Sequence, residues 1–351
     1  MFVSPEIKKH YDAFWNGEAV DRACFYVAVR HDTGIPAETD VTKKREDLGA
    51  RAHGEAAVAT KSDYLADGFP YHFVNFGPGA LAAMTGGSYR WAENTVWFEN
   101  EPFLVQDWDN PPATKLDKDS AMYHFVEDYT EKLLEKQSGV VSISDIGLSL
   151  DLVASFRGAQ NLLYDLYDDP EAVKAFLLAQ RPIWKEYFDA ACEKLIARQG
   201  GMCSWMPIYS AVPYYPLQCD FSAMISPEMF GEFMLPDLEY YTSIMPRSIY
   251  HWDGPGEIPH LDHLLSLKNL NAIQWTPGSG NPDLCDECWF ELYERIQKAG
   301  KSLILLGVHE LDGTERLLKK GSTKGLFLHC DTPDEKLAKE MVRLVESYGV
   351  K

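Results

Sequence analysis

His251 and Asp253 are side chains that can bind a metal or move a proton, and they stand two residues apart where an apolar run ends at Tyr250. Residues i and i+2 of an extended strand point to the same side. The spacing therefore predicts that both groups project together from a strand end, just before the turn at Gly254 and Pro255. The alternative is that the Asp caps this turn and the His bonds to backbone, because short motifs are weak evidence when taken singly.

The elements that must position these groups are short apolar runs alternating with helical patterns. Strands are predicted over 24–30, 71–76, 140–146, 202–209, 248–252, 272–275, 303–308 and 326–329. The clearest helices are predicted over 120–136, 170–198, 228–244 and 336–348. Because strands that alternate with helices pair in parallel, the sequence predicts an α/β fold.

The number of predicted units indicates the architecture. Eight strand–helix units predict a single (β/α)8 TIM barrel domain over residues 1–351, with an N-terminal helical extension and inserted loops at 32–63 and 91–118. A doubly wound sheet is the second candidate for the fold. It is less favoured, because no glycine-rich phosphate loop follows the first strand.

The composition is that of an ordinary folded chain, 46% hydrophobic and 25% charged. The net charge of −20 repels nucleic acid and anionic membranes. The seven cysteines are odd in number and scattered, which indicates reduced thiols. The first residues do not resemble a signal peptide, and no apolar run approaches the roughly 20 residues of a membrane span. We therefore expect a cytoplasmic protein with a small-molecule substrate.

Polar and ionisable residues gather at the predicted strand ends, which meet at one mouth in a barrel. Burying so many polar groups without partners would cost about 1–3 kcal/mol each, so the set as a whole indicates a site. The predicted catalytic residues are Asp145, Tyr209, Gln274 and Glu310. The predicted substrate-binding residues are Arg30, Asn75, Trp275 and His329. For each residue alone, a satisfied polar group or a helix cap is the alternative.

Three of the strand-end residues predict a metal site. His251, Asp253 and Cys330 offer a nitrogen, an oxygen and a sulfur ligand, a set that suits Zn²⁺ with a fourth position open for substrate. Such a site would deprotonate a bound thiol substrate. The alternative is that Cys330 is a small buried hydrophobe, the common fate of an unpaired Cys.

Three stretches of the sequence carry a family resemblance. They are Phe156-Arg157-Gly158 with 166–170, Ser226-Pro227-Glu228-Met229-Phe230 with Leu235-Pro236, and Tyr250-His251-Trp252-Asp253-Gly254. In these stretches the chain resembles the uroporphyrinogen decarboxylase superfamily, from about residue 121 onward. The resemblance implies a (β/α)8 barrel with its site at the mouth. It also implies one of two activities: cofactor-independent decarboxylation, or zinc-dependent methyl transfer from a methylated corrinoid protein to a thiol such as coenzyme M.

Departures from the family pattern bear on the choice between these activities. Decarboxylases of the superfamily carry Arg-Gln-Ala-Gly-Arg after the first strand, whereas here only Arg30 remains as a clamp for substrate carboxylates. The methyltransferases carry His-x-Cys after strand five and a Cys after strand eight. Here Asp253 replaces the first Cys, while Cys330 has a place matching the second. An Asp in place of the Cys removes a thiolate ligand and makes zinc less favoured, so the site could bind another metal or no metal.

The residues and the resemblance together favour a corrinoid-dependent methyltransferase-like enzyme. The metal-activated nucleophile would take a methyl group from a corrinoid protein, or the reverse reaction would demethylate a small substrate. The corrinoid is expected from a partner protein, since no cobalamin-binding domain is evident in this chain. A homodimer is a further expected assembly. The alternatives are a decarboxylase-like lyase and a non-catalytic small-molecule-binding barrel.

Overall fold

The strands of the protein are mostly short and are separated by helices, as the sequence predicts. A computed structural model describes residues 2–35, 45–92, 96–98 and 101–351. The strands in these ranges are β1 (Cys24–Val29), β2 (Asp63–Ala66), β3 (Tyr71–His72), β4 (Arg90–Trp91), β5 (Val96–Trp97), β6 (Val140–Val141), β7 (Tyr214–Leu217), β8 (Arg247–Asp253), β9 (Ala272–Thr276), β10 (Ser302–Leu306) and β11 (Leu326–Thr332).

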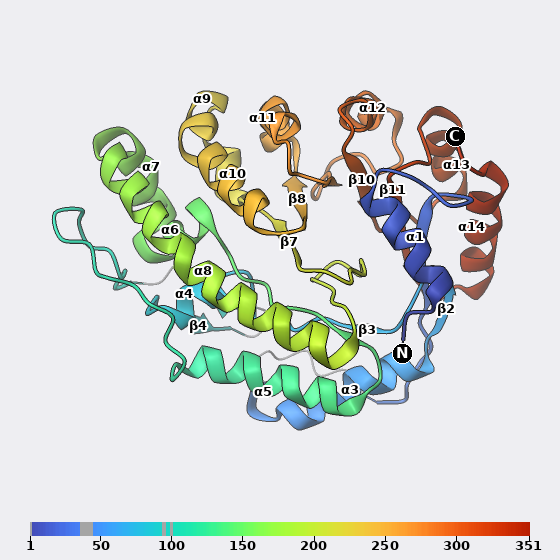
Figure 1. Ribbon diagram of the computed structural model, residues 1–351, viewed down its shortest axis with the longest axis horizontal. Helices are drawn as coiled ribbons and strands as arrows, with labels where there is room; N and C mark the ends of the chain where they lie inside the picture. Colours follow the sequence, from blue (N-terminus) through green and yellow to red (C-terminus); the bar gives the residue numbers. More distant parts are fainter. Residues whose placement is uncertain (1, 36–44, 93–95, 99–100) are drawn as a thin grey trace.

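Helices follow most of the strands and lie around them (Figure 1). The longer ones are α1 (Pro5–Trp15), α3 (Leu48–Lys61), α5 (Ala121–Lys136), α6 (Ser149–Arg157), α7 (Ala159–Asp168), α8 (Pro170–Gln199), α10 (Leu235–Ile244), α12 (Phe290–Lys298), α13 (Leu311–Lys320) and α14 (Glu335–Tyr348). The shorter ones are α4 (Ala80–Met84), η1 (Asp220–Met224), α9 (Pro227–Met229), η2 (Phe230–Met234), η3 (Pro255–His260), α11 (Leu261–Ser266) and η4 (Glu287–Trp289).

One seven-stranded sheet contains most of the strands, in the order β2-β1-β11-β10-β9-β8-β7. All neighbours from β1 to β7 pair in parallel, and β2 lies antiparallel at one edge. A second, two-stranded parallel sheet joins β3 to β6. The α/β class with parallel pairing is therefore confirmed.

Among the described residues the strand ladders do not close into a barrel, but this parallel α/β arrangement is compatible with the barrel-like fold that the sequence predicts. The predicted strand 202–209 forms only isolated bridges, from Cys203 to Ser142 and from Met202 to Ser210. The second bridge is antiparallel, so the chain folds back here, and Pro207 has no N–H to donate to a ladder. The next segment, β7, pairs with β8 in its place.

Side-chain hydrogen bonds hold the smaller sheet against the larger one and give the molecule a barrel-like form. The Tyr26 hydroxyl on β1 donates to the carbonyl of Phe69, just before β3, at 2.9 Å. On the other side, the Tyr215 hydroxyl of β7 donates to Asp145 Oδ1, just after β6, at 2.7 Å. The carboxyl ends of β6, β7 and β8 thereby come near one another.

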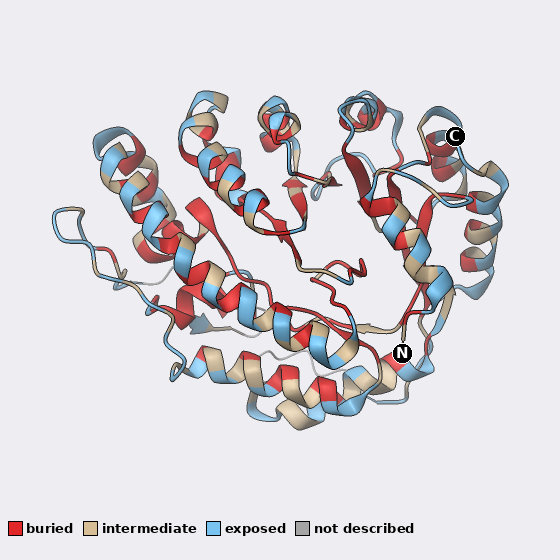
Figure 2. Ribbon diagram, viewed as in Figure 1, coloured by how far each residue is buried: buried red, intermediate tan, exposed pale blue. Residues whose placement is uncertain are grey.

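The core lies between the strands and the inner faces of the helices (Figure 2). Every residue of β1 is buried, as expected for a strand covered on both faces. On α14, the buried residues Ala338, Met341 and Val345 recur every three to four positions, which is one helical face. Within the described ranges, no helix combines the length and the apolarity that crossing a membrane requires.

The helix predicted over 228–244 is not uniform. It begins after Ser226, whose side chain accepts from the N–H of Met229, but it widens into a π-helical turn at Phe230–Met234. Pro236 explains this widening, since it cannot donate to the carbonyl four residues before it. Such turns often occur near functional sites.

Candidate metal centre

His251 and Asp253 lie on the same face of β8. The residues between and before them, Trp252 and Tyr250, are fully buried on the other face. Strand β8 is paired on both sides, with β7 and with β9, and this pairing determines which of its side chains point to each face. Both polar side chains are partly exposed at the carboxyl end of the strand.

Asp220 joins them from a neighbouring segment. One ligand atom each from Asp220, His251 and Asp253 lies within 4.8 Å of the other two. Asp220 is the first residue of η1, and it is exposed. Sequence reasoning missed it because β7, the strand that leads to it, was not predicted. We call these three residues the metal group.

The position of Asp220 depends on Asp151 in the first turn of α6. Asp151 Oδ2 accepts from the backbone N–H of Asp220 at 2.9 Å, and Oδ1 accepts from that of Phe221, also at 2.9 Å. One carboxylate thus fixes the first turn of η1. Burial, with the nearby charge of Asp220, raises the pKa of Asp151 to about 7.

The ring of His251 is oriented by Gln274 on the adjacent strand β9. His251 Nδ1 is hydrogen-bonded to Gln274 Oε1. The Gln274 amide is itself held, because Nε2 donates to Thr276 Oγ1 at 2.6 Å and to the carbonyl of Trp275 at 3.0 Å. Gln274 Oε1 is an acceptor, so the proton of a neutral His251 is on Nδ1. The lone pair of Nε2 is therefore available to a ligand, an arrangement typical of metal-binding histidines.

Asp145 is a predicted catalytic carboxylate whose pKa is affected by the charges of two members of the metal group, His251 and Asp220. It is buried, and its Oδ1 accepts from Tyr215. Burial raises the pKa of Asp145 to about 6, against the opposing effect of the Tyr215 hydrogen bond and of His251, while Asp220 raises it further. Although the residue is exposed, loss of water around the Asp220 carboxylate raises its pKa, as does the charge of Asp253, while His251 lowers it.

Glu257 is a second carboxyl that sequence reasoning missed. It lies in η3, directly after β8, and it is 1% exposed. Neither of its carboxyl oxygens has a hydrogen-bond partner in the described part of the chain. Burial, together with the charges of Asp220, Asp151 and Asp253, raises the pKa of Glu257 to about 9. Carboxyls are therefore crowded around the metal group, an arrangement that a divalent cation would relieve.

Cys330 is not a member of the metal group. It is fully buried on β11. Because side chains alternate along a strand, it lies on the opposite face from His329 and Asp331. Its Sγ lies 3.8 Å from Nδ1 of His309. Burial raises the pKa of the Cys330 thiol to about 11.

Arg30 and His329 lie on the β1–β11 side of the strand ends. The Arg30 guanidinium binds Asp331 through several contacts, including Nη2 to Oδ2 at 2.6 Å. His329 stacks on Tyr26 with ring centroids 5.2 Å apart, and burial lowers its pKa to about 4. The predicted anion-binding arginine is thus already paired with a carboxylate of the same chain.

The remaining predicted residues make other contacts. The Tyr209 hydroxyl donates to the carbonyl of Gly200 at 2.6 Å, next to the end of α8. Trp275 is fully buried against Trp252, with ring centroids 4.5 Å apart, because it follows Gln274 and so faces the helices. Asn75 and Glu310 are exposed in the segments after β3 and β10. The structure does not bring these four side chains into the metal group.

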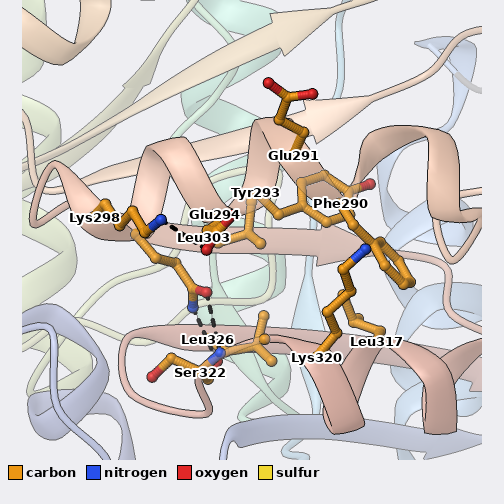
Figure 3. A pocket seen from close by; sticks show the side chains of 12 residues that line it. Phe290, Glu291, Tyr293, Glu294, Lys298, Leu303, Leu317, Lys320, Ser322 and Leu326 are labelled. Carbon is orange, nitrogen blue, oxygen red and sulfur yellow. Dashed lines mark hydrogen bonds and ion pairs between the residues drawn. The ribbon is translucent and has the colours of Figure 1, made fainter.

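Two cavities differ in their relation to this centre. One, of about 390 Å³, lies between α12 and α13 and contacts Leu303 and Leu326, which stand near the starts of β10 and β11 (Figure 3). It contains none of the predicted site residues. The other, of about 640 Å³, is lined by Asp220 and Asp151 among others, so it adjoins the metal group.

Comparison with known proteins gives one structural likeness. No family model and no curated protein matches the sequence. Among solved structures, a methyltransferase from Methanosarcina mazei is similar, with a TM-score of 0.59 and 12% sequence identity over 99% of each chain. At this identity the likeness shows the fold alone. The chain therefore shares the α/β fold of a protein that is named a methyltransferase.

Proposed function

We propose that this protein is a metal-dependent methyltransferase that moves a methyl group between a corrinoid protein and a small molecule. The observation that carries the proposal is the metal group, with three ligand atoms within 4.8 Å of one another at the carboxyl ends of parallel strands. The fold likeness to a methyltransferase and the resemblance to the uroporphyrinogen decarboxylase superfamily support the reaction class.

In this proposal Asp220, His251 and Asp253 hold the metal. Two carboxylates and one imidazole fit Zn²⁺, and they also suit harder ions such as Mn²⁺ or Fe²⁺ better than a thiolate set would. A bound divalent cation would act as a Lewis acid on the substrate atom that receives or gives the methyl group. The sequence-based set, with Cys330 as third ligand, is the alternative that the experiment below distinguishes.

The other residues of the site support this group. Gln274 occupies Nδ1 of His251 and so leaves Nε2 for the metal, and Asp151 holds the turn that carries Asp220. Asp145, anchored by Tyr215, is proposed to accept the proton that an acceptor loses when it becomes a nucleophile. The corrinoid is proposed to come from a partner protein docked over the strand ends.

The decarboxylase-like alternative is less well supported. A polycarboxylate substrate needs cationic side chains, and the Arg30 guanidinium is already bound to Asp331.

Metal analysis of the purified protein tests the proposal. We expect about one ion per chain in the wild type, as in other catalytic centres with three protein ligands. His251→Ala and Asp220→Asn should remove it or bind it much more weakly. The matched control is His53→Ala, which changes an exposed histidine on α3 and should retain the metal.

The outcomes separate the ligand sets. Loss of the ion in Cys330→Ser, with retention in Asp220→Asn, would favour the sequence-based set. A folded wild type that binds no added Zn²⁺, Mn²⁺ or Fe²⁺ would contradict a metal-dependent enzyme and favour a non-catalytic binding protein. Methyl transfer from a methylated corrinoid protein, assayed with the metal-loaded protein, then tests the reaction itself.

A further inference from the structure

The cavity of about 640 Å³ beside the metal group has a wall that is largely apolar. Its volume is in the range of small-molecule sites. Its lining comes from segments that follow β3, β6 and β7, from β5 and the residue after it, from α6 and from the start of α7. The lining residues are Pro78, Gly79, Val96, Trp97, Phe98, Gly147, Asp151, Leu152, Ala154, Ser155, Ala159, Gln218, Asp220, Phe221 and Met224.

The backbone at Gly79 lets an aromatic ring lie at this wall. A Cβ at this position would stand 2.2 Å from Cγ of Phe98, which no side chain tolerates. Phe98, Trp97 and Phe221 then give the cavity three aromatic side chains. Aromatic faces bind apolar groups, and they also attract cations such as quaternary ammonium groups.

The charged groups of the cavity are all acidic. Asp151 and Asp220 are its ionisable residues, and Ser155 and Gln218 are its neutral polar ones, so none of the lining residues is Lys, Arg or His. Arg30, the cation predicted to bind a substrate anion, is not among the lining residues and is bound to Asp331.

This composition disfavours an anionic ligand. Moving a sulfonate or carboxylate from water into an apolar cavity is unfavourable unless a net positive charge compensates it. A divalent ion in the metal group is balanced by Asp220 and Asp253, so it leaves no net positive charge for such a ligand. A neutral molecule meets no such penalty. A cation gains from the aromatic faces, and from Asp151 where that carboxyl is ionised.

We propose that this cavity binds the small-molecule substrate, and that the substrate is a neutral or cationic molecule with an apolar body, such as a methylated amine or a methyl ether. This inference rests on the proposed function, since it assigns the partner of the metal group. It excludes sulfonates, phosphates and polycarboxylates as the molecule that this cavity takes.

Three probes that share a benzyl body and differ in charge test the inference. They are benzyltrimethylammonium, benzyl methyl ether and phenylmethanesulfonate, each titrated into the protein as purified by calorimetry. We expect the ammonium and the ether to bind at least about tenfold more tightly than the sulfonate, a difference of about 1.4 kcal/mol, because the sulfonate charge is left uncompensated in a partly buried site. A sulfonate that binds as tightly as the other two, or more tightly, would overturn the proposal.

A charge placed on the cavity wall shows where the probes bind. Met224 lines the cavity and is 51% exposed, so Met224→Lys should fold normally. It should strengthen sulfonate binding and weaken ammonium binding, each about fivefold or more. Met224→Leu is the matched neutral variant. Leu178→Lys adds the same charge on α8, at a position that is 54% exposed and outside the cavity, and should change neither affinity.

The two proposals fail in different ways. If Met224→Lys leaves all three affinities unchanged, the probes bind elsewhere and the substrate assignment is wrong. Metal content and methyl transfer are measured separately, so the proposed function can fail while the charge preference holds. Conversely, a preference for the sulfonate would contradict the substrate assignment but would not contradict the proposal that Asp220, His251 and Asp253 bind a metal.

Discussion

The backbone N–H of Asp220 donates to Oδ2 of Asp151 at 2.9 Å, across 69 positions of the chain. This bond joins the start of η1 to the first turn of α6. Because the same carboxylate also accepts from Phe221, the turn has little freedom to rotate. Asp220 therefore faces His251 and Asp253 in an arrangement that no local sequence pattern encodes.

Replacing Asp151 should weaken metal binding although it is not proposed as a ligand. Asp151→Ala removes both acceptors of the η1 turn, and we expect the metal dissociation constant to rise by about 10- to 100-fold, the usual effect of losing a group that orients a ligand. Asp151→Asn keeps one oxygen acceptor and should recover part of the affinity. Competition with a chromogenic chelator measures both.

A surface aspartate provides the control for this experiment. Asp312→Ala on α13 changes an exposed carboxylate and should leave the metal affinity unchanged. Equal metal affinity in wild type and Asp151→Ala would show that Asp220 either is positioned by other contacts or does not bind the ion.

Gln274 should act on the metal through the His251 ring. In Gln274→Leu the Nδ1–H loses its acceptor, so the ring can turn and the other tautomer becomes accessible. We expect about a tenfold or larger loss of metal affinity. Gln274→Glu keeps an acceptor oxygen and should retain or exceed the wild-type affinity.

Gln160→Leu on α7 is the matched control, because Gln160 is exposed and belongs to another helix. Full metal affinity in Gln274→Leu would contradict the orienting role, and Gln274 would then be a satisfied polar group of the strand pair.

His72 should make the free energy of unfolding depend on pH. It is 1% exposed on β3, its Nε2 bonds to Ser138 Oγ at 2.9 Å, and burial lowers its pKa from 6.5 to about 4. Between these two values the unfolded chain binds more protons than the folded one, so stability falls as the pH drops from 6.5 towards 4. His72 should account for at most about 3 kcal/mol of this fall.

Urea unfolding at pH 7 and pH 5, with EDTA present to exclude metal linkage, measures the effect. In His72→Gln the loss of stability between these pH values should be smaller than in the wild type. His53→Gln changes an exposed histidine and should retain the wild-type difference. Identical pH dependence in His72→Gln and the wild type would show that His72 is protonated as readily in the folded protein as in the unfolded one.

Features that depend on residues close together in the chain could be predicted from the sequence, whereas features that depend on distant residues could not. The shared face of His251 and Asp253 depends only on the two-residue period of one strand. Most strands, and the helices α5, α8, α10 and α14, are likewise visible as local patterns. Asp220 depends on β7 and on Asp151, far away in the chain, so its role emerges only from the folded structure.

Strand register explains why some residues predicted for the site lie outside it. Gln274 and Trp275 both stand at the end of β9, but His251 pairs with Gln274, so Trp275 necessarily faces the helices. The same alternation on β11 separates Cys330 from His329. A strand end can be predicted from sequence, whereas which of two neighbours faces the site depends on pairing with other strands.

Asp253→Cys tests the ligand chemistry at the position where the sequence departs from the family pattern. A thiolate is a softer ligand than a carboxylate, so the variant should prefer Zn²⁺ over Mn²⁺ by about tenfold more than the wild type does. Competition between the two ions, followed by metal analysis, gives this ratio. Asp253→Asn retains the shape but donates more weakly, so it should bind both ions less tightly. If neither variant changes the ratio or the affinity, Asp253 does not contact the ion, and His251 and Asp253 are better interpreted as an acid–base pair.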